Sequence, residues 1–481
     1  MTPLTFPVVP RPAVSIVMPT YGGWEWVERS LTAVTENTDP CYEMILVDNA
    51  SPDGLAERLA AEVRNARLVR NVVNRGFGCA NNQGAAYATG AALLFLNSDA
   101  FVHPGWLPPL LERLEQDDRT AAVGPRILNT DGSLQEAGSL LFQNGYSQFY
   151  GFGDEATRPE YRFARRVDYA SAVCLLVRRR DFWEVGGFDA VYAPAYFEDV
   201  DLCLALAARG LATVYEPRST VTHVRGASGD EQTAGEYWSR NLPVFEKRWS
   251  DVLASRPAFP ADEKDLRARI AARDVRAPVR LLVAADRFSE PASAFEPRVL
   301  WLLRELATLY PDSRVTLLSP GDAPAGLLEP LAALGIEVAS PKDLEAWLKA
   351  RAFHYDVVLS GGGTPRTPSS SSSWRAPSRR RIASSIWAGR TPLRGGRGPA
   401  AAGGGGSASS RNSLPPTSSS PPRRPTSVER ERSRTTLPVS CSRRHSKEAP
   451  ICPAFPSAGT SSFSPHRTSK EIRRTPRPSR P

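Results

Sequence analysis

Between Val14 and Leu96 one pattern repeats, in which a short apolar run is followed by a longer amphipathic stretch. The expected strands are Val14–Met18, Glu43–Val47, Leu68–Val73 and Ala92–Leu96, and the expected helices are Trp24–Glu36, Leu55–Val63 and Cys79–Ala88. Strands that alternate with helices in this way indicate a mostly parallel sheet with helices on both faces. We therefore expect an α/β fold.

Small and polar residues stand where each of these expected strands ends. They are Pro19, Thr20 and Tyr21 after the first strand, Asp48 and Asn49 after the second, Asn74 to Gly78 after the third, and Asn97 to Asp99 after the fourth. In open α/β sheets, ligands bind beyond the carboxyl ends of the strands. The sequence therefore predicts one site at this edge of the sheet.

The chain after the fourth strand is predicted to complete one domain and begin another. Residues 126–166 have weak periodicity and are expected to form long loops over the site. A strand near 172–177, a helix after Asp201, a strand near 212–215 and a helix near 236–249 are expected to close a domain of residues 13–251. After a linker, 252–276, residues 277–360 read as a second, partial Rossmann-like α/β unit that stops halfway through a doubly wound domain.

The composition changes abruptly at residue 361. Residues 361–481 contain 23 Lys and Arg against four Glu and no Asp, a net charge of +19, whereas the preceding part carries −10. A segment dominated by Ser, Pro, Arg and Gly buries too little apolar area to fold, so we expect a disordered tail. It is either a basic arm for polyanions or, as we favour, a stretch translated in the wrong frame. The acidic folded part gives no reason to expect nucleic-acid binding.

No apolar run reaches the roughly 18 residues that a membrane span needs, and the N-terminus lacks the charged and apolar regions of a signal peptide. We expect a cytoplasmic protein. Peripheral association with the inner face of the membrane is left open.

The first strand ends offer groups for a nucleotide. Asp48 could accept hydrogen bonds from the edge of a base, or it could be an ordinary turn residue. The segment NRGFGCANNQGAA pairs a Gly-rich turn with a helix N-terminus, which suits a phosphate group. It does not fit the dinucleotide fingerprint, because the third glycine is replaced by Asn81. A Ser hydrolase elbow and a phosphate-binding P-loop are also missing from the sequence.

Later residues offer a metal ligand and a base. Asp99 ends an apolar strand, where a carboxylate can hold a hard cation, or it could simply end that strand in a turn. Glu198 and Asp199 open a helix, either as a general base or as acids that stabilise the helix terminus. His223 follows a strand and is either a ligand or a structural histidine.

Six segments in order resemble the inverting glycosyltransferases of family 2, which have the GT-A fold for nucleotide-diphospho-sugar transferases. They are SIVMPTY, ILVDNAS, NRGFGCANNQG, LFLNSDA, GGFDAVYAPAYFEDVDLCLALAARG and HVRGAS. The bacterial rhamnosyltransferase-like members, which build cell-surface polysaccharide, are most similar. The unit of residues 277–360 resembles the first half of an N-terminal GT-B domain.

This resemblance implies a role for each candidate residue. Pro19, Tyr21 and Asp48 would contact the base and ribose, and Asn74, Gly76 and Asn82 would shape the nucleotide pocket. Asp99 would be the last acid of a D-x-D motif whose first acid is replaced by Asn97, and Asp99 and His223 would bind a divalent cation, Mg or Mn. Asp199 of the E-D pair with Glu198 would be the catalytic base.

The resemblance also implies the reaction, which is transfer of a sugar from a nucleotide-diphosphate donor to a hydroxyl of a glycan or lipid-linked acceptor. An alternative is a non-catalytic nucleotide-sugar-binding or truncated protein with a polyanion-binding tail. A nucleotidyltransferase is a third possibility, but such an enzyme would need a Gly-rich phosphate loop after the first strand, where this chain has PTYGGW.

Overall fold

The computed structural model describes residues 3–225, 231–262, 264–285, 295–319 and 325–361. The strands are β1 (Leu4–Thr5), β2 (Val14–Thr20), β3 (Tyr42–Asp48), β4 (Val63–Arg64), β5 (Arg67–Arg70), β6 (Ala92–Leu96), β7 (Ala100–Val102), β8 (Thr120–Leu128), β9 (Leu134–Glu136), β10 (Ser139–Leu141), β11 (Ser147–Phe149), β12 (Arg165–Val167), β13 (Cys174–Arg178), β14 (Ala212–His223), β15 (Arg280–Ala285), β16 (Arg314–Leu318), β17 (Glu337–Ala339) and β18 (Val357–Gly361).

The helices are α1 (Trp24–Asn37), α2 (Leu55–Glu62), α3 (Phe77–Ala86), α4 (Leu107–Gln116), α5 (Arg179–Glu184), α6 (Glu198–Ala208), α7 (Glu231–Arg248), α8 (Ser250–Ala254), α9 (Leu266–Arg273), α10 (Phe295–Leu309), α11 (Ala325–Ala333) and α12 (Leu344–Ala350), with 3-10 turns η1 (Pro159–Tyr161) and η2 (Ala190–Tyr192). The expected tail, residues 362–481, and the end of the HVRGAS segment lie outside the described residues.

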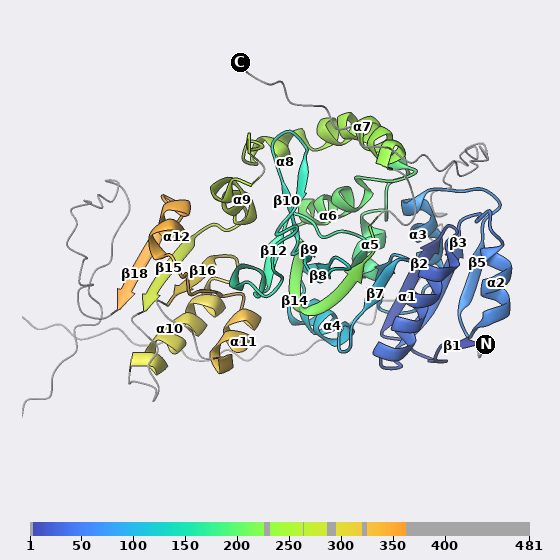
Figure 1. The fold of residues 1–481 in the computed structure, drawn as a ribbon, viewed down its shortest axis with the longest axis horizontal. Coiled ribbons are helices and arrows are strands. Elements are labelled where there is room, and N and C mark those ends of the chain that lie inside the picture. Colours follow the sequence, from blue (N-terminus) through green and yellow to red (C-terminus); the bar gives the residue numbers. More distant parts are fainter. Residues whose placement is uncertain (1–2, 226–230, 263, 286–294, 320–324, 362–481) are drawn as a thin grey trace, which may run out of the picture. The chain divides into compact units, whose positions relative to one another are not determined.

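The predicted α/β fold is confirmed. The main sheet has the order β12-β14-β8-β13-β6-β2-β3-β5. Strands β2, β3, β5 and β6 of this sheet are parallel: β2 pairs with β3 and β6, and β3 pairs with β5. Thr20 lies opposite Asp48 in the register, so the carboxyl ends of β2 and β3 are neighbours. Figure 1 shows α1 and α2 beside these strands.

The other half of the main sheet is mixed. Strand β13 is antiparallel to both β6 and β8, and β14 is parallel to β8. Strand β14 is longer than expected, because it continues from Ala212 to His223 and pairs with β7 at its far end. There His223 lies opposite Ala100. This pairing places His223 beside the turn that follows β6.

Alternating residues of the central strands face two separate cores. Ile16 and Met18 of β2 pack with residues of α1, α2 and α4, whereas Val17 packs with α3, α5 and α6. All three side chains are buried. A strand covered on both faces is apolar throughout, which is why β2, β3 and β6 read as continuous apolar runs.

The expectation of long loops over residues 126–166 is wrong. Strand β8 runs on to Leu128, and β9, β10, β11, η1 and β12 follow in this stretch. Strands of three residues are too short to show a periodic pattern in the sequence. They are held by their own apolar cluster, which includes Leu134, Phe142 and Tyr161.

A second sheet has the order β17-β16-β15-β18, and all of its pairings are parallel. Apart from the last residue of β18, this sheet lies within residues 277–360, for which a partial α/β unit is expected, and α11, between β16 and β17, contains Pro330. Within the described residues, no helix combines the length and the apolar character that crossing a bilayer requires.

Candidate active site

The carboxyl ends of β2 and β3 present Pro19, Tyr21 and Asp48. Tyr21 is exposed and Asp48 is buried. One carboxylate oxygen of Asp48, Oδ2, accepts a long hydrogen bond from the backbone N–H of Ser51 at 3.4 Å. The other, Oδ1, is buried without a hydrogen-bond partner in the part of the chain that the structure describes. Because such an acceptor is costly to bury unpaired, Asp48 suits a ligand that supplies an N–H or O–H donor.

The Gly-rich turn before α3 is tied to β3 through asparagine side chains. Asn49 donates from Nδ2 to Oδ1 of Asn74 at 2.8 Å, and the same oxygen of Asn74 accepts the N–H of Gly76 at 2.8 Å. Asn49 Oδ1 in turn accepts the N–H of Arg75 at 3.0 Å. Asn74 therefore shapes this turn through hydrogen bonds inside the protein.

Gly76 lies at the N-terminus of α3 and Asn82 lies within this helix. Both contact the segment of chain that leads to α6. Gly76 has a φ of +83°, and the following N–H, of Phe77, donates to the carbonyl of Pro194 at 2.7 Å. Asn82 pairs with both backbone groups of Phe188, at 2.7 and 2.9 Å. Asn82 thus holds the turn before η2 close to α3.

Asp99 and His223 form a close pair. Nε2 of His223 lies 3.2 Å from Oδ1 of Asp99, and Nδ1 lies 2.9 Å from Oε1 of Gln135. Gln135 donates from its Nε2 to Asn129, which leaves its Oε1 as an acceptor. The Nδ1 of His223 therefore carries a proton, and in the neutral ring the lone pair of Nε2 faces the carboxylate of Asp99.

This arrangement fits a divalent cation. A lone pair and a carboxylate oxygen repel each other unless a proton or a cation lies between them. Asn97 approaches within 3.5 Å of His223 Nε2, and its Oδ1 is buried without a hydrogen-bond partner among the described residues. Within those residues no three acidic, His or Cys side chains are grouped to hold a metal. The pair therefore suits an open site that the phosphate oxygens of a ligand would complete.

Glu198 and Asp199, at the start of α6, have different surroundings. Burial, followed by the charge of Asp199, raises the pKa of Glu198 well above its usual value, and Glu198 Oε2 has no hydrogen-bond partner among the described residues. Burial also raises the pKa of Asp199, but Asp199 accepts the N–H groups of Ala172 at 3.2 Å and Val200 at 2.9 Å. These bonds stabilise its charged form. Of the two acids, Asp199 therefore keeps its negative charge more readily than Glu198.

The segment before β13 connects the E-D pair with the Asp99 turn. The N–H of Ala172 binds Asp199, and the carbonyl of the next residue, Val173, accepts the N–H of Asn97 at 2.9 Å. The start of α6 also packs on α3, since a Cβ on Gly78 would lie 3.6 Å from the Cβ of Glu198. The candidate base, the candidate metal ligands and the Gly-rich turn thus belong to one network.

Asn241 of α7 is a part of this network that the sequence did not reveal. It is 1% exposed, and its Nδ2 donates to the carbonyls of Tyr192, Ala195 and Tyr196 at 2.7, 2.9 and 3.0 Å. Tyr196 and Phe197 have φ angles of 75° and 76°, which residues other than glycine rarely adopt. Asn241 therefore fixes a strained loop directly before the E-D pair. An isolated Asn in a helix belongs to no motif that would have indicated this.

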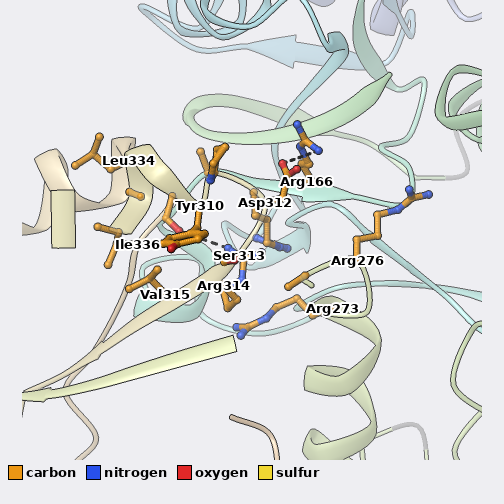
Figure 2. Close-up of a pocket in the computed structure, with 16 residues that line it drawn as sticks. Arg166, Arg273, Arg276, Tyr310, Asp312, Ser313, Arg314, Val315, Leu334 and Ile336 are labelled. Atoms are coloured by element: carbon orange, nitrogen blue, oxygen red, sulfur yellow. Dashed lines mark hydrogen bonds and ion pairs between the residues drawn. The ribbon is translucent and has the colours of Figure 1, made fainter. Parts of the chain in front are cut away.

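A cavity of about 50 Å³ lies elsewhere and is rich in arginine (Figure 2). Arg273 pairs with Glu337 at 2.9 Å, and Arg166 pairs with Asp312 at 2.7 Å. The other two labelled arginines also have partners, Arg314 with Asp274 and Arg276 with Asp168. Because these four arginines already have carboxylate partners, the cavity is not assigned a ligand.

Comparisons with known proteins point to one family. Residues 15–186 match the family described as Glycosyl transferase family 2. The N-acetylglucosaminyl-diphospho-decaprenol L-rhamnosyltransferase of Mycobacterium tuberculosis is 30% identical over 255 residues, which cover 48% of this chain and 82% of that protein. The O-antigen biosynthesis protein RfbC of Myxococcus xanthus is 28% identical over 244 residues, 48% of this chain and 19% of that protein.

A solved structure, that of GalNAc-T7 with UDP, GalNAc and Mn2+, aligns with a TM-score of 0.40 and 19% identity, over 62% of this chain and 58% of that one.

Proposed function

The chain belongs to glycosyl transferase family 2, and on this premise we propose that it moves a sugar from a nucleoside-diphosphate donor to a hydroxyl of a glycan or lipid-linked acceptor, with inversion at the anomeric carbon. It is a glycosyltransferase, with a rhamnosyltransferase and an O-antigen biosynthesis protein among its relatives. The names of these relatives support a role in the synthesis of cell-surface polysaccharide.

The donor nucleotide is proposed to bind at the ends of β2 and β3. Pro19 and Tyr21 would contact the base and ribose of the donor. Oδ1 of Asp48, which has no partner among the described residues, would accept a hydrogen bond from the base or the ribose. The turn held by Asn74 and Gly76 would face the donor, with Asn82 supporting that turn from α3.

Asp99 and His223 would hold a divalent cation, Mg or Mn, together with the donor diphosphate. When bound, such a cation offsets the negative charge that develops on the leaving diphosphate. The protein's own contribution is to orient the ligands, because Gln135 fixes the ring of His223 through Nδ1.

Asp199 is the proposed general base. It would take the proton of the acceptor hydroxyl, whose oxygen forms a bond to the anomeric carbon. The bond from that carbon to the diphosphate breaks, and the nucleoside diphosphate leaves with the electron pair. Glu198 is proposed to assist as a neutral neighbour, since a protonated acid cannot accept this proton.

One observation carries the proposal: Ala172 and Val173, adjacent in the chain, bind the carboxylate of Asp199 and the backbone of Asn97. A transferase needs its base at a fixed distance from the diphosphate, so that the acceptor attacks in line. A two-residue connection between the two groups provides such a fixed spacing.

We further propose the domain limits 13–251 and 277–360, joined by the linker 252–276. The parallel sheet of β15 to β18 supports reading the second unit as the first half of a GT-B-like N-terminal domain. The reaction is proposed to take place in the cytoplasm or at the inner face of the membrane, where lipid-linked acceptors would present their sugars.

The test uses the purified full-length chain with a panel of UDP-, GDP- and dTDP-sugars. Release of nucleoside diphosphate is measured with Mg²⁺, with Mn²⁺ and with EDTA. At least one donor should be turned over, and Asp199→Asn should slow that turnover by about two to four orders of magnitude. Glu184→Gln is the matched control, since Glu184 is exposed and pairs with Arg209 on the surface. A chain that turns over no donor, or an Asp199→Asn variant as active as the control, would contradict the proposal.

A further inference from the structure

Glu136, at the end of β9, is a buried carboxylate that the proposed reaction does not use. It lies in the stretch that the sequence suggested to be loops. Its Oε1 accepts the hydroxyl of Ser139 at 2.9 Å and the backbone N–H of Ser171 at 3.2 Å. Ser171 directly precedes Ala172, whose N–H binds Asp199. Glu136 and Asp199 therefore bind consecutive amides of one segment.

The charged and titratable groups around Glu136 come from four parts of the chain. They are Asp199 of α6, Arg165 of β12, Tyr215 of β14 and Tyr169 before β13. Tyr169 is buried and interacts with both carboxylates. Arg165 lowers the pKa of Glu136, and its Nη2 donates to the backbone carbonyl of Ala137. The charge of Asp199 therefore raises the pKa of Glu136, and the charge of Arg165 opposes this effect.

Burial, opposed by the hydrogen bonds of Ser139 and Ser171 and reinforced by the charge of Asp199, raises the pKa of Glu136 to about 7. The interaction between two carboxylates is mutual. When Glu136 ionises, it must therefore also increase the affinity of Asp199 for a proton.

We propose that Glu136 is a positioning residue for Asp199: its carboxylate fixes the Ser171–Ala172 segment that holds Asp199, and its negative charge makes Asp199 a stronger base. This inference rests on the proposed function, in which Asp199 accepts the acceptor proton. It assigns Glu136 two separable effects, one of hydrogen bonding and one of charge.

Two substitutions separate these effects. Glu136→Gln keeps an oxygen that accepts from Ser139 and Ser171 but removes the charge, whereas Glu136→Ala removes both. At pH 6 Glu136 is mostly protonated and carries no charge, as in the Gln variant. Wild type and Glu136→Gln should therefore have the same kcat at this pH. As the pH rises to 8, kcat of the wild type should increase by about three- to tenfold, because a stronger base removes the proton faster, and Glu136→Gln should show no such rise. Glu136→Ala should lose about tenfold or more at every pH, since Asp199 is no longer held in place.

The experiment measures kcat, the KM for the donor and the thermal midpoint Tm of the full-length chain between pH 5.5 and 8.5. Exposed Glu155 provides the control variant Glu155→Gln, which should follow the wild type throughout. A Glu136→Gln variant with the wild-type pH profile, or a wild type whose kcat falls as Glu136 ionises, would overturn the inference while leaving the transferase intact. A wild type that turns over no donor sugar would instead show that the proposed function itself has failed.

Discussion

Gly76 and Pro194 are in direct backbone contact, although 118 positions separate them in the chain. A Cβ at position 76 would lie 2.6 Å from the Cα of Pro194 and 2.7 Å from its carbonyl oxygen. The Gly-rich turn and the loop before α6 thus meet at a point where no side chain fits. The turn of the proposed donor site therefore touches the loop that leads to the E-D pair.

Gly76→Ala should therefore affect both binding and stability. The substituted residue must adopt a φ of +83° and also push Pro194 away. We expect a destabilisation of about 2 to 4 kcal/mol and a donor KM raised by about tenfold or more, from the cost of strain and overpacking. Thermal unfolding and donor titrations measure the two effects.

Gly105 offers a matched control for this prediction. Its φ is +73°, but a Cβ there would have no neighbour within 4 Å. Gly105→Ala should show only the cost of a left-handed backbone, about 1 kcal/mol, with an unchanged donor KM. Equal behaviour of the two variants would mean that the contact with Pro194 has no importance for the donor.

The two acids of the E-D pair should respond differently to neutral substitution. Asp199→Asn removes the carboxylate and should lower kcat by about two to four orders of magnitude, with donor affinity nearly unchanged. Burial and then the charge of Asp199 raise the pKa of Glu198 well above its usual value, so its charged form is disfavoured. Glu198→Gln should therefore keep kcat within about threefold of the wild type.

Steady-state kinetics at saturating donor measure this difference, and circular dichroism checks that both variants fold. If Glu198→Gln abolished transfer and Asp199→Asn did not, the roles of the two acids would be exchanged.

Removal of the divalent cation should weaken donor binding. Nε2 of His223 and Oδ1 of Asp99 lie 3.2 Å apart, close enough to bind one cation together, and Asn97 contributes no charge. By calorimetry, EDTA and Asp99→Ala should each raise the Kd of the donor by about tenfold or more, and Asp99→Ala in EDTA should add little further. Glu184→Gln should respond to EDTA as the wild type does. Equal Kd values with and without metal would show that a site with Asn97 in place of an acid works without a cation.

Much of the fold could be predicted from the sequence because the first half of the main sheet is covered on both faces. Strands such as β2 and β6 are then apolar throughout and end at polar residues, so both their position and the polar edge of the candidate site can be read from the pattern. The same strand ends brought Asp48, the Gly-rich turn and Asp99 into the predicted site. The pairing of β14 with β7 then places His223 beside Asp99.

The remainder depends on contacts between distant parts of the chain. Strands β9 to β12 are too short to show a period, so the surroundings of Glu136 could not be anticipated. Asn241 acts through three carbonyl groups more than 40 positions away, which no local pattern encodes. The different surroundings of Glu198 and Asp199 also depend on burial and on the N–H of Ala172, although the two acids are adjacent in the sequence.

The ion pairs around Arg273 should make stability depend on acid pH. Burial alone would raise the pKa of Glu337, but the charges of Arg273 and then Arg351 lower it to about 2. Burial would also raise the pKa of Asp274, but Arg273 and Arg314 hold it well below its usual value. Since carboxylates in the unfolded chain have pKa values of about 4, these pairs stabilise the folded state above that pH and lose their effect as the pH falls toward 2.

Arg273→Met should remove this contribution, because it leaves Glu337 and Asp274 buried with one cation fewer. We expect a loss of about 3 to 5 kcal/mol at pH 7, and a smaller difference from the wild type at pH 3, where the carboxylates begin to take up protons. Urea unfolding at both pH values measures the two differences. Arg209→Met serves as the control, because Arg209 pairs with Glu184 on the surface and should change stability by less than about 1 kcal/mol at either pH. A loss for Arg273→Met that is the same at pH 3 as at pH 7 would assign the effect to packing of the arginine side chain rather than to its charge.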